Sequence, residues 1–150
     1  MVRRHEPPMS SIAFNLPRTV TLAADAALLG LAATHGYVLA TATDPPGYFA
    51  GYCVAVIIGC VVAAGTTWID VDHIVPAAGW MTGGIICTAV VIGYPISRLV
   101  NLPGLAALTG RWDLAPGSLT LACAAAFLGL YLTVLSGVNV AFGQRRGWYE

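Results

Sequence analysis

The stretch that decides the fold is PPGYFAGYCVAVIIGCVVAAGTTWI, residues 45–69, which contains no Arg, Lys, Asp or Glu. A helix needs about 20 apolar residues to cross a bilayer, so this stretch is long enough to span one. Two similar stretches cover 74–97 and 114–144, and 19–43 is interrupted only by Asp25 and His35. None of these segments keeps the polar face that a helix of a soluble bundle needs. The sequence therefore predicts an all-α, polytopic membrane protein with a bundle of four transmembrane helices.

The composition supports the same interpretation. Of the 150 residues, 57% are apolar and 9% are charged, whereas an ordinary soluble domain carries about 25% charged residues. So little charge cannot cover a water-facing surface, which excludes a soluble enzyme, a nucleic-acid-binding protein and a disordered tail. We expect spans at about 19–42, 48–69, 76–98 and 117–141, which together form a transmembrane domain over 19–141. Residues 1–18 and 142–150 are expected to form the N-terminal and C-terminal tails.

The positions of the arginines predict the orientation. Those that lie before the first span or after the last are Arg3, Arg4, Arg18, Arg145 and Arg146. The other two, Arg98 and Arg111, lie in the segment that joins the third and fourth spans. Basic residues collect on the cytoplasmic side of a membrane. We therefore expect a multi-pass protein of the cell (plasma) membrane with both termini in the cytoplasm.

Small residues recur at helical spacing in the second and third spans. Membrane helices associate through close packing of small residues, because lipid tails are as apolar as leucine. The residues concerned are Gly51, Ala55, Gly59 and Ala63, with Gly79 and Gly83. They could serve packing inside the bundle, or they could form a face on which another subunit docks.

Asp25 and His35 are the candidate polar site inside the membrane. An ionisable group at membrane depth is a functional hypothesis by default. The two residues lie about 15 Å apart along a helix, so they cannot touch. Asp25 could instead bond to Arg18, a neighbouring helix or a partner. Because His35 is the only histidine within a span, a haem or quinone would have to be held at an interface that is shared with a partner.

Other candidate sites are weaker. Asp70, Asp72 and His73 could hold a divalent cation, but they are adjacent in the chain, and closed sites usually draw ligands from several segments. The cysteines all lie within spans, where Cys behaves as a small apolar residue. We therefore expect no catalytic residues, no metal and no cofactor that the chain holds alone.

The segment GYPISRLVNLPG, residues 93–104, carries a resemblance to a known group of proteins. It resembles a G-Y-x-x-S-R-x-x-x-L-P-G stretch that follows the third helix in uncharacterised small four-helix integral membrane proteins of high-GC Gram-positive bacteria. His35 and the aromatic start of the second span, Tyr48 to Tyr52, are similar too, whereas Pro95 departs from the pattern. The resemblance covers about 35–104 and implies the four-helix topology, without an assigned reaction.

These observations favour a non-catalytic accessory subunit of a larger membrane complex, with a respiratory or other electron-transfer complex preferred. Its partners would be other integral membrane subunits and lipids. The first alternative is a small homo-oligomeric transporter or channel that uses Asp25 and His35. The second alternative is a haem- or quinone-binding subunit.

Overall fold

The computed structural model describes residues 17–69, 74–106, 109–110, 112, 115–139 and 141. The regular elements in these ranges are four α-helices: α1 (Pro17–Thr41), α2 (Gly47–Thr66), α3 (Ile74–Leu99) and α4 (Ala115–Leu135). Each is long and apolar enough to cross a membrane. The predicted all-α fold with four membrane helices is therefore confirmed, while the predicted tails lie almost wholly outside the described residues.

Two helices, α2 and α4, end several residues earlier than predicted. The helix α2 stops at Thr66 and not at residue 69, and the N–H of Thr67 closes its last turn by donating to the carbonyl of Ala63 at 3.3 Å. The helix α4 stops at Leu135 and not at residue 141. Gly137 follows with φ of 72°, a left-handed conformation that commonly ends a helix.

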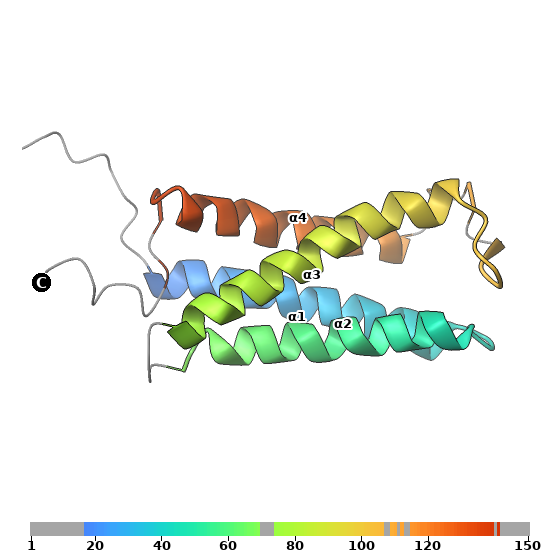
Figure 1. Ribbon diagram of the computed structural model, residues 1–150, viewed down its shortest axis with the longest axis horizontal. Coiled ribbons are helices and arrows are strands. Elements are labelled where there is room, and N and C mark those ends of the chain that lie inside the picture. Colours follow the sequence, from blue (N-terminus) through green and yellow to red (C-terminus); the bar gives the residue numbers. More distant parts are fainter. Residues whose placement is uncertain are drawn as a thin grey trace, which may run out of the picture.

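The four helices run alternately up and down (Figure 1). We call the end at which α1 begins and α4 ends the proximal end, and the end with the α1–α2 turn and the α3–α4 connection the distal end. Each helix packs against its neighbours in the chain, and α4 packs back against α1. The bundle is thus closed in the order α1, α2, α3, α4.

The helix α3 crosses the bundle obliquely (Figure 1). Near the proximal end it lies close to α2, where a Cβ on Gly79 would come within 2.9 Å of the carbonyl oxygen of Ala63. Further along it keeps contact with α4, where a Cβ on Gly83 would come within 2.5 Å of the ring of Phe127. Because α3 leaves α2 and stays beside α4, the distal half of the bundle is more open between α2 and α3.

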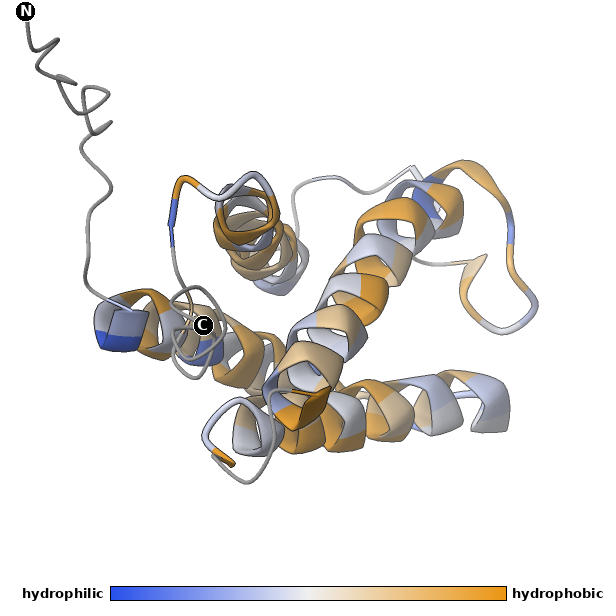
Figure 2. Ribbon diagram, turned by 60° about the vertical axis from the view of Figure 1, so that its left-hand side comes forward, coloured by the Kyte–Doolittle hydropathy of each residue, from blue (hydrophilic) through white to orange (hydrophobic). Residues whose placement is uncertain are grey.

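Apolar side chains form both the interior and much of the surface. Orange alternates with pale colours along the helices, and the strongly hydrophilic blue lies near their ends and in the connections (Figure 2). The rings of Trp80 and Phe127 stack at 5.6 Å inside the bundle. Large apolar residues such as Ile58, Ile85 and Leu132 are exposed, as expected where a helix faces lipid.

A candidate binding cavity at the distal end

A cavity of about 440 Å³ lies within the distal half of the bundle. All four helices and the start of the α3–α4 connection line it, and most of its wall is apolar. Pockets for small ligands usually have volumes of roughly 300 to 1,000 Å³ and a few placed polar groups in an apolar wall. The lining residues are His35 and Val38 from α1; Tyr48, Phe49, Tyr52 and Cys53 from α2; Val90, Gly93, Tyr94, Ile96, Ser97 and Arg98 from α3; Leu102 and Leu105; and Pro116, Gly117 and Thr120 from α4.

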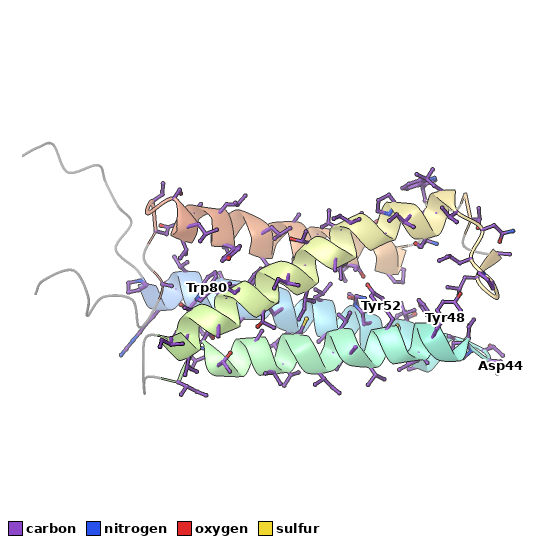
Figure 3. The ribbon with its side chains drawn as sticks, in the orientation of Figure 1. Asp44, Tyr48, Tyr52 and Trp80 are labelled. Atoms are coloured by element: carbon purple, nitrogen blue, oxygen red, sulfur yellow. The ribbon has the colours of Figure 1, made fainter. Side chains whose placement is uncertain are left out.

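Aromatic rings gather on the α2 side of the cavity. Tyr48 and Tyr52 lie one helical turn apart near the start of α2, toward the distal end, whereas Trp80 lies near the proximal end (Figure 3). The ring of Tyr52 contacts the ring of His35 edge to face, with the centroids 5.6 Å apart, and Phe49 lies beside it at 6.4 Å. Such a wall can hold a flat ring by edge-to-face and stacking contacts.

His35 is the polar group that α1 supplies to the cavity. It is 7% exposed, and its Nδ1 lies 2.9 Å from the carbonyl oxygen of Leu31, one turn earlier in the helix. Because a carbonyl oxygen can only accept, Nδ1 carries the hydrogen and donates it. This bond fixes the ring against its own helix and leaves Nε2 at the far side of the imidazole.

A hydrogen-bonded pair of hydroxyls joins α1 to α4 beside the cavity. The Oγ1 of Thr120 lies 3.1 Å from the Oγ1 of Thr34 and 2.8 Å from the carbonyl oxygen of Pro116. The Oγ1 of Thr34 donates to the carbonyl of Leu31 at 2.9 Å. Both threonines are buried, so these bonds satisfy groups that would otherwise be costly at membrane depth.

Arg98 brings a positive charge to the cavity from the last turn of α3. A cation is favourable at a helix C-terminus, where the backbone carbonyls carry partial negative charge. The guanidinium lies over the ring of Tyr94 at 5.0 Å from the centroid, and Tyr94 in turn contacts Trp112 edge to face at 6.1 Å. A cation over an aromatic face at this distance is attracted by the ring electrons. Arg98 is 6% exposed, so its charge lies inside the protein.

The α3–α4 connection is tied to the α1–α2 turn across the distal end. The hydroxyl of Tyr48 donates to the carbonyl oxygen of Pro103 at 2.5 Å. Gly104 has φ of 76°, and a Cβ on it would come within 2.6 Å of the side chain of Pro46. Glycine is therefore required at this position both by conformation and by the close approach. Leu102 and Leu105 of the same connection line the cavity.

The structure places Asp25 away from this cavity, at the proximal end of α1. Its carboxylate accepts hydrogen bonds from the Oγ1 of Thr67 at 3.1 and 3.3 Å and from the Nε1 of Trp68. Asp25 is 6% exposed and ties α1 to the end of α2. Asp25 therefore does not line the distal cavity that His35 lines.

Asp25→Ala is expected to lower the stability of the bundle by about 2 kcal/mol, because the indole N–H of Trp68 loses this acceptor and Thr67 loses its link to α1. The hydroxyl of Thr67 keeps the carbonyl of Ala64 as an acceptor, at 2.7 Å. Asp25→Asn keeps one oxygen in place and should lower the stability clearly less. Unfolding of the three proteins in the same detergent measures both differences. Equal stability of Asp25→Ala and the unchanged chain would show that the cluster contributes nothing.

The small residues of α2 divide between two environments. Gly59 and Ala63 face α3, since a Cβ on Gly59 would come within 2.6 Å of the side chain of Ile86, and Ala63 is fully buried. Gly51 and Ala55 are exposed, and a Cβ on Gly51 would meet nothing within 4 Å. The predicted stripe thus packs inside the bundle along its proximal half, and its distal half lies on the surface.

The weak metal candidates Asp70, Asp72 and His73 lie outside the described residues. Within the described ranges no group of three or more His, Cys, Asp or Glu side chains could hold a metal ion. The cysteines there are unpaired thiols, and three of the four are buried.

No protein-family model, curated protein or solved structure matches this chain. The resemblance over 35–104 therefore stays a prediction, and the site must be interpreted from its own geometry.

Sequence reasoning identified His35 and missed most of the residues that surround it. The aromatic cluster at 48–52 and Tyr94 entered the prediction only through the resemblance, and Arg98 was used for the orientation but not for a site. Tyrosines and an arginine at the ends of membrane spans are common at the membrane–water interface, so their pattern in the sequence did not indicate a cavity.

Proposed function

We propose that this chain is a non-catalytic membrane subunit that holds a lipid-soluble, ring-bearing molecule of the quinone class in the distal cavity. The observation that carries the proposal is the cavity itself, an apolar space of about 440 Å³ with aromatic rings along α2 and polar groups at His35, Ser97 and Arg98. A quinone matches this lining, because it has a flat ring, a few oxygen atoms and an apolar tail.

The surroundings of the cavity support a ligand that arrives through the membrane. The helices that line it are long and apolar enough to cross a bilayer. The lining residues Tyr48 and Ile96 are also exposed on the surface of the bundle, so the cavity reaches a surface that would face the membrane. If the arginines orient the chain as predicted, the distal end faces the outside of the cell. The ligand head would then lie in the outer half of the membrane.

The exposed distal half of the α2 stripe supports a place in a larger assembly. Gly51 and Ala55 lie on the surface, and small residues permit the close helix approach on which association in lipid depends. This exposed face and a quinone-class ligand together favour an accessory subunit of a respiratory or other electron-transfer complex over a protein that acts alone.

The proposal is tested on protein extracted gently from its own membrane. We expect a solvent extract of the purified sample to be enriched in quinone-class molecules relative to the phospholipids of the bulk membrane. Co-purifying subunits would support the accessory role. If the extract has the composition of the bulk membrane, the chain does not bind a quinone-class ligand. A Soret band in the absorption spectrum would show that the bound molecule is haem.

A further inference from the structure

The hydrogens of three polar groups that line the cavity are already used within the protein. His35 Nδ1 donates to the carbonyl of Leu31 at 2.9 Å. The Oγ of Ser97 donates to the carbonyl of Tyr94 at 2.7 Å. The hydroxyl of Thr120 has acceptors in the carbonyl of Pro116 at 2.8 Å and the hydroxyl of Thr34 at 3.1 Å. Each group therefore keeps lone pairs, and no free hydrogen, for a ligand.

His35 is the strongest of these acceptors. A charged imidazolium at membrane depth is costly, and a neutral imidazole has one hydrogen only. Since Nδ1 holds that hydrogen, Nε2 carries a lone pair. The ring is held by its bond to Leu31 and by its contact with Tyr52 at 5.6 Å. His35 lines the cavity, so its Nε2 can serve as an acceptor for a ligand there.

We propose that the cavity selects a ring with free hydroxyl groups over the corresponding carbonyl compound, that is, a quinol over a quinone, with His35 Nε2 accepting a hydroxyl hydrogen. This inference rests on the proposed function and names the redox form that the site holds. A quinone oxygen has no hydrogen to give, so it would meet the lone pairs of His35, Ser97 and Thr120 without a partner. An unmatched buried acceptor is unfavourable.

The donors that line the cavity do not reverse this preference. Arg98, Tyr52 and Tyr94 carry N–H or O–H groups that can donate to a ligand. A quinol oxygen can accept from one of these groups while its own hydrogen goes to His35. A quinone oxygen can only accept. The hydroxyl form therefore satisfies both kinds of group, and the carbonyl form satisfies one.

The test measures equilibrium binding of three probes to the full chain in nanodiscs under anaerobic conditions: decyl-benzoquinol, decyl-benzoquinone and the dimethyl ether of the quinol. Empty nanodiscs correct for partition into lipid. We expect the quinol to bind about tenfold more tightly than either of the others, as one or two hydrogen bonds would give. Equal affinities, or a preference for the quinone, would overturn the inference and leave the proposed function standing. Binding of none of the probes would overturn both.

His35→Phe keeps an aromatic ring and removes the acceptor. We expect it to reduce the preference for the quinol to about threefold or less while quinone binding persists. Tyr37→Phe is the control, because Tyr37 is an exposed residue of the same helix outside the cavity lining, and it should keep the full preference. A preference that survives His35→Phe undiminished would show that His35 is not the acceptor.

A second measurement needs no change at His35. In a chain that carries His5→Gln and His73→Gln, the ¹⁵N spectrum of labelled histidine reports His35 alone. We expect the signals of a neutral ring with the hydrogen on Nδ1. A ring with its hydrogen on Nε2, or with hydrogens on both nitrogens, would overturn the inference whatever the binding data.

Discussion

Gly93→Leu is expected to lower the affinity for a quinone-class ligand by at least about tenfold while the bundle stays folded. Gly93 lines the cavity, and a Cβ built on it meets nothing within 4 Å. A leucine side chain can therefore enter the cavity without moving a neighbour, and a ligand that competes for the same space must be forced aside. Overpacking by a few methylene groups costs about 1 to 3 kcal/mol, and 1.4 kcal/mol corresponds to a factor of ten in affinity.

Gly129→Leu is the matched control for this experiment. Gly129 also lies within a helix, is exposed, and offers open space to a Cβ, but it does not line the cavity. Titration of decyl-benzoquinol into each variant in nanodiscs measures the difference. Unchanged binding in both variants would contradict the predicted site, since the added side chain at Gly93 would then occupy space that no ligand uses.

Gly79→Val is expected to destabilise the bundle by about 3 kcal/mol, at the upper end of what overpacking costs. A Cβ on Gly79 would lie 2.5 Å from the Oγ1 of Thr66 and 2.9 Å from the backbone oxygen of Ala63. Because a backbone atom cannot move aside as a side chain can, α2 and α3 would have to separate at this contact.

Gly51→Val separates this effect from the general cost of a β-branched residue in a helix. Gly51 belongs to the same α2 stripe, but nothing lies within 4 Å of its Cβ position, so the change should stay within about 0.5 kcal/mol. Unfolding by a denaturing detergent, followed by circular dichroism, gives both values. Equal losses in the two variants would contradict the close contact between α2 and α3. If Gly51→Val lowers the stability strongly in the assembled complex and not in the isolated chain, a partner packs on that face.

The fold could be predicted from the sequence because its signal is local. Four apolar stretches, interrupted only by Asp25 and His35 in the first, are long enough to cross a bilayer, and no other architecture satisfies their backbone groups in lipid as simply. The ends of the helices were predicted less accurately, since they depend on single residues. Gly137 in the left-handed region shortens α4, and composition does not reveal its conformation.

The cavity could not be predicted because it depends on how α3 crosses the bundle. His35, Tyr52, Arg98 and Thr120 come from four different helices, and no spacing in the sequence relates them. Their juxtaposition follows from small residues elsewhere, such as Gly79 and Gly83, which hold α3 against α2 at one end and against α4 beyond it. The small residues were recognised, but the direction in which each one faces was not.

The role of Asp25 illustrates the same limit. A carboxylate within a span indicates a polar partner, and the sequence left open whether that partner was Arg18, another helix or another protein. In the structure the partners of Asp25 are Thr67 and Trp68, at the end of α2. These residues follow a long apolar stretch, and only the antiparallel return of α2 beside α1 brings them to Asp25.

The most direct test of the central claim is native mass spectrometry of the chain and of its Gly93→Leu variant, each released gently from the membrane in which it was made. We expect the unchanged chain to retain a species with the mass of a quinone or quinol, and Gly93→Leu to lose it while keeping the same subunit composition. If the unchanged chain carries no such species, or if both proteins carry it equally, the distal cavity is not the site of a quinone-class ligand.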